Sequence, residues 1–235
     1  MYLNFLYHDF VAKLRGVLPR WDIKSKKLVT FKNSQTNNDR WILDMLDRKE
    51  NGFFVEAGAM DGISNSSTFV LEKYFNWKGI LIEADSDYKS LGKNRPNSIC
   101  LNKILSDKDG TEEFILFPMT AYSCTESSFL ENKEKIIRVQ KDIGNFSYKK
   151  IRIEAVPLAA LLKEHNAPKI IDYLALDIEG SELKVLKDFP FERYKFRCIA
   201  IEGHRCDELL FSKGYKKVIN KYNINAPWES YFLLN

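Results

Sequence analysis

Short apolar runs that alternate with helical stretches constrain the fold of this chain more than any other feature. The runs cover residues 53–59, 79–85, 98–105, 171–178 and 197–202. Runs of this kind, separated by helices, predict parallel strands that are covered on both faces. Two further segments, 215–219 and 230–234, have no helix between them and predict a closing antiparallel hairpin. The expected class is therefore α/β, with a doubly wound sheet whose ligands bind at the carboxyl ends of the strands.

The composition excludes several other classes of protein. Hydrophobic residues make up 45% of the 235 residues, which rules out disorder for most of the chain. No apolar run approaches the roughly 18 residues that a membrane span needs. With 36 basic and 32 acidic residues the net charge is only +4, so we expect no nucleic-acid partner bound through a general basic surface. The cysteines form no Cys-x-x-Cys pair and the first residues do not resemble a signal peptide, which together predict a cytoplasmic protein.

The chain divides into an arm and one domain. Residues 1–18 place apolar side chains three and four positions apart, which predicts an amphipathic helix. We expect this N-terminal helical arm, residues 1–33, to pack on the domain or on a second copy of the chain in a homo-oligomer; attachment to a membrane surface is the alternative. Residues 34–235 form the domain. Within it the polar stretch 118–150 interrupts the rhythm of strands and predicts a substrate lid.

The first motif with chemical content lies at the end of the first strand. Residues 56–62 read EAGAMDG. Small residues around Gly58 let the backbone approach a ligand, and the helix expected after them offers free N–H groups. The acids Glu56 and Asp61 would repel a pyrophosphate but suit a cationic amino group, which favours S-adenosylmethionine over a dinucleotide. The alternative is that the glycines only serve a tight turn.

Two further positions fit the rest of such a cofactor. Glu83 ends the second strand, 25 residues after Gly58, where an acid can accept hydrogen bonds from both ribose hydroxyls. Asp85 is the alternative acid. Ser106 and Asp107 follow the third strand, where a polar pair can bind the exocyclic amine of adenine. The turn sequence DKDG explains that pair equally well.

Ionisable side chains also follow the fourth and fifth strands. The fourth run leads into Asp177 and Glu179, and the fifth into Glu202 and His204. Burying charge is costly unless it is paired or bound to a metal. Because these two strands should be neighbours, Asp177, Glu202 and His204 are candidate ligands for Mg²⁺ or Mn²⁺. The alternative is a metal-free site in which Asp177 or His204 is the general base and Glu202 orients it.

The chain resembles the FkbM-type family of S-adenosylmethionine-dependent methyltransferases from about residue 34 to its end. Four segments carry the resemblance: FFVEAGAMDGISNSSTFVLEK, WKGILIEAD, LNKILSDKDGTEEF and IDYLALDIEGSELKVLKDF. It implies a class I methyltransferase sheet of seven strands with the last strand antiparallel. It also implies methyl transfer to a hydroxyl of a small molecule or glycan, such as a sugar or a glycosylated or polyketide metabolite.

By position, the resemblance assigns roles to individual residues. It implies cofactor contacts for Glu56, Gly58, Asp61 and Glu83, and active-site roles for Asp177 and Glu179. One departure concerns His204, because Gly203 separates it from Glu202, whereas in many relatives a histidine follows the acid directly. Two other functions compete with an O-methyltransferase. A non-catalytic binding module is disfavoured by the acids at the strand ends, and a dinucleotide oxidoreductase by the glycine spacing and the acidic turn.

Overall fold

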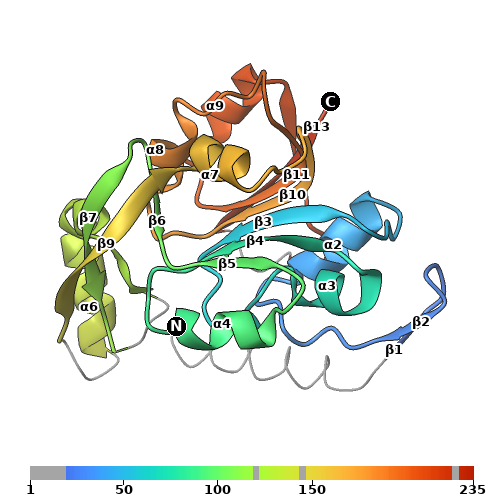
Figure 1. The fold of residues 1–235 in the computed structure, drawn as a ribbon, viewed down its shortest axis with the longest axis horizontal. Helices are drawn as coiled ribbons and strands as arrows, with labels where there is room; N and C mark the ends of the chain where they lie inside the picture. Colours follow the sequence, from blue (N-terminus) through green and yellow to red (C-terminus); the bar gives the residue numbers. More distant parts are fainter. Residues whose placement is uncertain (1–19, 119–121, 143–146, 224–227) are drawn as a thin grey trace.

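A seven-stranded sheet forms the centre of the molecule (Figure 1). The computed structural model describes residues 20–118, 122–142, 147–223 and 228–235, so the helix expected over 1–18 lies outside the described residues. The α/β class with one large sheet is confirmed. The last strand runs antiparallel to both of its neighbours, and the other paired strands from β5 to β11 are mutually parallel. In spatial order the strands are β12 (Tyr215–Val218), β13 (Glu229–Leu234), β11 (Lys195–Glu202), β10 (Ile170–Leu176), β3 (Phe53–Ala57), β4 (Lys78–Ile82) and β5 (Ile99–Leu101).

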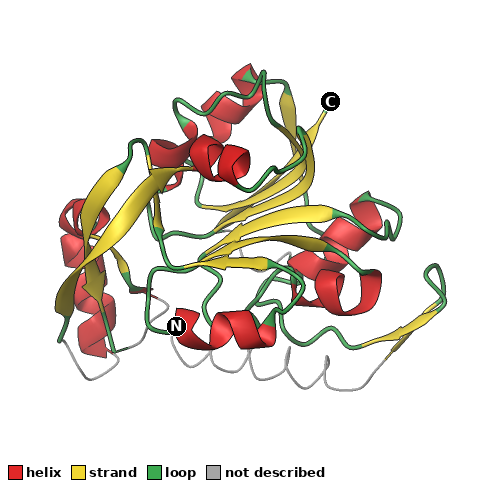
Figure 2. Ribbon diagram, viewed as in Figure 1, coloured by secondary structure: helices red, strands yellow, loops and turns green. Residues whose placement is uncertain are grey.

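Helices cover both faces of this sheet (Figure 2). Successive strand residues point to opposite faces, so each strand contributes to two separate apolar layers. Phe54 of β3 belongs to the layer with Trp41 and Leu71, whereas Val55 belongs to the layer with Leu161 and Leu186. The first layer lies under α2 (Asn38–Met45), α3 (Phe69–Phe75) and α4 (Tyr88–Asn94). The second lies under α7 (Leu158–Glu164), α8 (Glu182–Leu186) and α9 (Asp207–Ser212).

A smaller four-stranded sheet lies beside the main one. Its order is β6 (Ile104–Ser106), β9 (Lys149–Pro157), β7 (Gly110–Leu116) and β8 (Cys124–Thr125). The prediction of a single strand over 98–105 was therefore wrong, because this run divides into β5 and β6, which belong to different sheets. The polar pair at 102–103 makes the break, and the Asn102 side chain donates a hydrogen bond to the carbonyl of Glu83 at 2.8 Å.

The stretch expected to be an irregular lid has regular structure over its described part. It contains β8 and the helices α5 (Glu126–Glu131) and α6 (Lys133–Asp142). Phe117, Cys124 and Phe129 form a small apolar cluster of their own under these elements. The described part of this polar stretch is therefore regular, since α5 and Ile136 of α6 pack on this small cluster.

A short hairpin lies within residues 20–29, in the part of the chain that was expected to form a helical arm. It consists of β1 (Arg20–Asp22) and β2 (Lys27–Val29). No helix within the described ranges is long and apolar enough to cross a membrane.

Candidate active site

The carboxyl ends of β3 and β10 meet at the point where the chain changes direction across the sheet. From β3 the chain continues to β4 on one side, and from β10 it continues to β11 on the other. In an open α/β sheet such a switch point opens a crevice for ligands. A small pocket of about 40 Å³ lies at this point, on the edge where the sequence predicted ligands. Its lining residues are Gln35, Thr36, Asn38, Glu56, Ala57, Gly58, Asn65, Ser67, Ala175, Leu176, Asp177, Glu202, Trp228 and Glu229.

Gly58 is required by the close approach of β3 and β10. Its backbone has a φ of +81°, and a Cβ built there would lie 1.9 Å from the carbonyl oxygen of Asp177. Its N–H donates to the carbonyl of Ile82 at 3.0 Å, as does that of Ala59 at 3.2 Å. The glycine therefore serves first to bring the ends of three strands together, which forms the floor of the pocket.

The helix expected after this glycine motif does not begin at the motif itself. Residues 58–68 form a loop, and α3 begins only at Phe69. Asp61 shapes this loop, because its carboxylate accepts hydrogen bonds from the N–H groups of Ile63 at 2.8 Å and Ser64 at 2.7 Å. The loop thus satisfies its own N–H groups at this position, and Asp61 is engaged before any ligand arrives.

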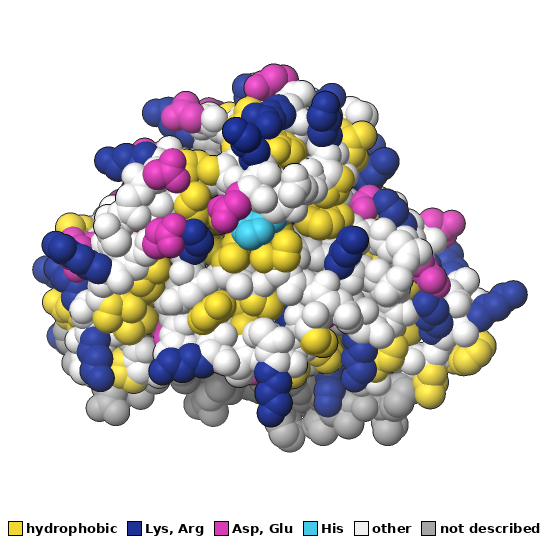
Figure 3. All heavy atoms as spheres, in the orientation of Figure 1, with side chains coloured by type: hydrophobic (Ala, Val, Ile, Leu, Met, Phe, Trp, Pro, Cys, Tyr) yellow, Lys and Arg dark blue, Asp and Glu magenta, His cyan; other side chains and the backbone are white. Residues whose placement is uncertain are grey.

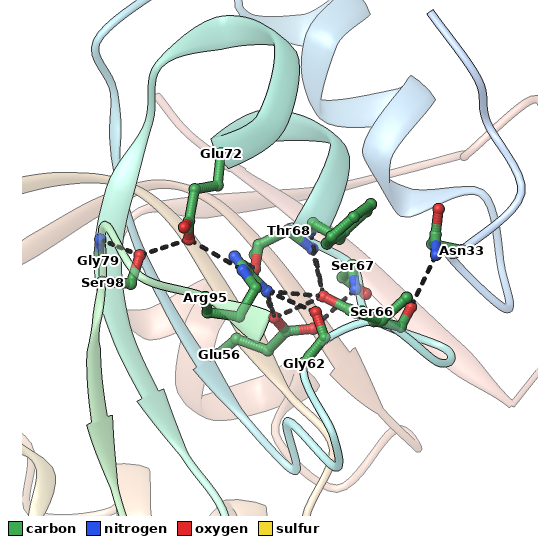
Figure 4. A network of polar contacts seen from close by, with 12 residues as sticks. Asn33, Glu56, Gly62, Ser66, Ser67, Thr68, Glu72, Gly79, Arg95 and Ser98 are labelled. Atoms are coloured by element: carbon green, nitrogen blue, oxygen red, sulfur yellow. Dashed lines mark hydrogen bonds and ion pairs between the residues drawn. The ribbon is translucent and has the colours of Figure 1, made fainter. Parts of the chain in front are cut away.

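Glu56 is buried beneath the same loop (Figure 4). One carboxylate oxygen accepts the N–H of Ser67 at 2.7 Å, and the other accepts the hydroxyl of Ser66 at 3.0 Å and that of Thr68. Glu56 also lines the pocket. Since both oxygens already have donors within the protein, Glu56 fixes the loop that a cofactor would contact.

Arg95 completes this buried network. Its side chain is 1% exposed and lies between two carboxylates, 2.9 Å from Glu72 and 3.6 Å from Glu56. It also donates to the carbonyl of Gly62 at 3.1 Å and to the hydroxyl of Thr68 at 2.8 Å. One guanidinium therefore ties the loop to α3 and α4, and it supplies the positive charge that two buried acids need.

Glu83 lies at the end of β4, facing the same loop. One of its oxygens accepts the N–H of Met60 at 2.7 Å, and the other accepts the N–H of Asp85 at 2.7 Å. Burial raises the pKa of Glu83, and these two hydrogen bonds oppose that rise. An ionised carboxylate has about four acceptor positions. One is therefore used to hold the loop and one to hold the turn after β4, and two remain for donors from a ligand.

The pair predicted to lie near an adenine belongs to the smaller sheet. Ser106 ends β6 and is 1% exposed, and its hydroxyl contacts the carboxylates of Asp107, at 3.0 Å, and Glu112. Lys184 lies 3.7 Å from Asp107 and 2.7 Å from Glu112. The hydroxyl of Ser106 is thus engaged with its own sheet, while Asp107 is open to solvent.

Three carboxylates meet beside the pocket. One oxygen each from Asp177, Glu179 and Glu202 lies within 4.8 Å of the others. Glu179 has a left-handed backbone with a φ of +54°, and the turn is held by Glu182, which accepts the N–H groups of Ile178 and Gly180 at 3.0 and 3.1 Å. A left-handed conformation costs a residue with a side chain about 1 kcal/mol or more. The conformation that places Glu179 next to the other two acids therefore lowers the stability of the fold.

Desolvation and nearby like charges raise the pKa of all three groups. Asp177 is in part exposed to solvent. Its pKa is nevertheless raised well above the usual range, mainly by desolvation and then by the charges of Glu202 and Glu179. Desolvation and the Glu202 charge likewise raise the pKa of Glu179. For Glu202, desolvation and then the Glu182 carboxylate raise the pKa to about 7, and Lys135 of α6 opposes this rise. The trio therefore attracts a proton or a cation near neutral pH.

The structure does not bring His204 into this group. Its Nδ1 lies 2.7 Å from the hydroxyl of Ser230 and 3.3 Å from the ammonium of Lys217, both on the β12–β13 hairpin. Gly203, with a φ of +77°, turns the chain between Glu202 and this histidine. Of the predicted set, Asp177 and Glu202 therefore lie together, and Glu179 rather than His204 is the third ionisable group beside them.

Glu229 was missed by the sequence analysis. It lines the pocket, lies opposite Glu202 in the register of β11 and β13, and accepts hydrogen bonds from Asn38 at 2.6 Å and Tyr231 at 2.7 Å. A signal for it did exist. An antiparallel final strand begins at the edge where the parallel strands end, so its first residue belongs to the same edge as Asp177.

The stretch predicted to be a lid is attached to the loop that carries Glu179. The hydroxyls of Thr125 and Ser128 lie 3.1 and 2.9 Å from that of Ser181. All three residues are buried. Ser181 precedes α8 but its side chain makes no capping hydrogen bond there, because it joins this hydroxyl cluster instead. The start of α5 is therefore fixed directly against the acidic site.

Several solved structures show a distant likeness to the chain, with TM-scores below 0.5. The METTL16 methyltransferase domain is 14% identical and matches with a TM-score of 0.44 over 95% of this chain and 75% of its own. The human methyltransferase 10 domain containing protein is 15% identical, with a TM-score of 0.39 over 84% and 79%. A chain of the fibrillarin/Nop5p complex is 11% identical, with a TM-score of 0.38 over 86% and 81%. No curated protein matches the chain.

A family model gives a more specific result. The model of the methyltransferase FkbM domain matches residues 56–213, which run from within β3 to the end of α9 and include the glycine motif, Glu83, the carboxylate trio and the stretch 118–150. This match covers more than half of the chain and agrees with the resemblance seen in the sequence. The chain therefore belongs to the FkbM methyltransferase family and is an S-adenosylmethionine-dependent methyltransferase.

Proposed function

We propose that this enzyme methylates a hydroxyl group of an uncharged acceptor, such as a sugar, a glycan, or a glycosylated or polyketide metabolite. The observation that carries the proposal is the trio of Asp177, Glu179 and Glu202 beside the pocket. An alcohol is a poor nucleophile, so its methylation needs a general base or a metal that lowers the pKa of the hydroxyl. Three adjacent carboxylates with raised pKa values can supply either.

The residues of the site fit the cofactor that the family implies. Four acids line the pocket, and no lysine or arginine is among its described lining residues. This negative lining suits the sulfonium and ammonium groups of S-adenosylmethionine, which supplies the methyl group when bound. Glu83 keeps two acceptor positions for the ribose hydroxyls, beside the loop after Gly58.

The remaining polar side chains of the pocket support an acceptor rich in hydroxyl groups. They are neutral amides and hydroxyls, which both donate and accept hydrogen bonds: Gln35, Thr36, Asn38, Asn65 and Ser67. Carboxylate, sulfate or phosphate groups on an acceptor would be repelled by the acids that share this lining. We therefore expect neutral glycosides to be better acceptors than uronates or sugar phosphates.

The mechanism assigns simple tasks to the chain's own residues. The acceptor oxygen forms a bond to the methyl carbon as the bond between that carbon and sulfur breaks, and the hydroxyl proton passes to a carboxylate. Without a metal, Glu202 is suited to take it, because a base works best when its pKa lies near the working pH, and its own is about 7. Holding the acceptor oxygen in line supplies much of the rate enhancement, since little new charge develops.

We further propose that the trio holds a divalent cation. Its oxygens lie within 4.8 Å of one another, and Mg²⁺ and Mn²⁺ prefer oxygen ligands. Desolvation and then the charge of Glu202 raise the pKa values of Asp177 and Glu179, and a cation would relieve the second of these effects. In this arrangement Glu179 takes the place that the sequence gave to His204.

The test uses the purified chain, methyl-labelled S-adenosylmethionine and a panel of neutral and acidic glycosides. We expect label on a neutral acceptor, loss of transfer with EDTA, and recovery with Mg²⁺ or Mn²⁺. Asp177→Asn should raise the metal concentration needed, whereas Glu208→Gln, a surface acid on α9, should change nothing. Full activity after exhaustive chelation would refute the metal and leave a carboxylate base, with a rate that rises with pH. Binding of S-adenosylhomocysteine without transfer to any hydroxyl would refute O-methylation and favour a binding module.

A further inference from the structure

One face of the β1–β2 hairpin is fixed to the protein. Val29 is fully buried. Asp22, on the same face, lies 2.8 Å from the guanidinium of Arg48, and Lys27 donates to the carbonyl of Tyr74 at 2.7 Å. These contacts hold the hairpin in a defined orientation. Because strand side chains alternate, the residues between them must point the other way.

The outward face of the hairpin is apolar. Trp21 and Leu28 are paired across the two strands and are 62% and 56% exposed. Ile23, in the connecting turn, is 81% exposed. A surface hairpin normally places its polar residues outward, so this arrangement is inverted. A cluster of exposed large apolar side chains on a rigid element indicates an interaction surface.

The hairpin lies in a basic segment of the chain. The segment 20–33 contains five lysines and arginines and a single acid. Lys24 and Lys26 lie in the turn beside Ile23 and are exposed; Lys24 contacts Asp47 at 3.0 Å in an ion pair open to solvent, which restrains it little. Figure 3 shows hydrophobic and basic side chains together at the end of the molecule where Figure 1 places β1 and β2.

We propose that this hairpin docks on an anionic lipid surface. Tryptophan and aliphatic side chains enter the boundary between headgroups and acyl chains, and lysines meet the negative headgroups. The hairpin offers exposed groups of both kinds, and its inner face is anchored to α3 and to the segment after α2. A docked hairpin would bring the domain to acceptors held at a membrane, although the inference does not depend on the acceptor.

Vesicle co-sedimentation of the full chain tests the proposal. We expect binding to vesicles of equal parts phosphatidylcholine and phosphatidylserine, and weak binding to phosphatidylcholine alone. The variant Trp21→Ser/Leu28→Ser should lose at least about tenfold in partitioning, because its apolar contacts with the interface are removed. The variant Lys24→Gln/Lys26→Gln should lose about fivefold per lysine, roughly 25-fold in all, on anionic vesicles only.

A matched control replaces exposed apolar residues elsewhere. Phe211 of α9 and Ile219 after β12 are 49% and 84% exposed, and Phe211→Ser/Ile219→Ser should bind vesicles like the wild type. Thermal unfolding of each variant shows whether the fold is retained. Equal vesicle binding by wild type and Trp21→Ser/Leu28→Ser would overturn the proposal, as would no binding by the wild type. A wild-type dimer in lipid-free sedimentation that becomes a monomer in Trp21→Ser/Leu28→Ser would assign the face to a second copy instead.

Discussion

Replacement of Glu83 by alanine separates its two tasks, the support of the loop and the binding of the cofactor. In the structure each oxygen accepts one backbone N–H, from Met60 and from Asp85, both at 2.7 Å. The two remaining acceptor positions are those assigned to the ribose hydroxyls. Hydrogen bonds to a charged group contribute about 1.5–3 kcal/mol each, so the loss of even one corresponds to at least about tenfold weaker binding.

The same substitution should also lower stability. Two N–H groups near a buried position would lose their acceptor, at a cost of about 1–3 kcal/mol for each group that water cannot reach. Isothermal titration with S-adenosylhomocysteine, at a temperature where the variant is folded, measures the first effect. Urea unfolding without ligand measures the second. We expect both to change.

A matched variant and a clear negative result complete this experiment. Asp85→Asn alters the neighbouring acid, whose carboxylate accepts the hydroxyl of Ser123 at 2.8 Å, and should leave affinity nearly unchanged. If Glu83→Ala loses stability but keeps its affinity for S-adenosylhomocysteine, Glu83 only supports the loop. If Asp85→Asn loses affinity instead, the ribose site lies at Asp85.

Two further substitutions test the energetics of buried charges. Arg95→Met should lower the free energy of unfolding in urea by about 3–5 kcal/mol, because Glu56 and Glu72 would stay buried without their cation; a loss below about 1 kcal/mol would contradict this. Asp39→Asn should stabilise the protein above neutral pH, because burial raises the pKa of Asp39 from 3.8 to about 7. Protonation of Asp39 stabilises the folded state. As the pH rises from about 4 to 7 the wild type therefore loses at most about 4 kcal/mol of unfolding free energy relative to the variant. If the difference in free energy of unfolding between the wild type and Asp39→Asn stays constant over this pH range, the raised pKa of Asp39 is refuted.

Much of the fold follows from local patterns. Apolar runs alternating with helices predict buried parallel strands, and the last two runs predict a hairpin, because side-chain periodicity is a property of each segment by itself. Acids placed directly after such runs must lie at one edge of the sheet. The place of Glu83, Asp177 and Glu202 at this edge could be predicted in this way, because it depends only on where the strands end and on their shared direction.

Tertiary structure decided which of these groups meet. Glu179 joins the trio through a left-handed turn that Glu182 holds, while Gly203 directs His204 to another hairpin. Glu56 is held through Arg95, a partner that no local pattern links to it. Strand ends are set by nearby residues, but the direction of a side chain after a turn and the partner of a buried charge depend on packing between segments far apart in the sequence.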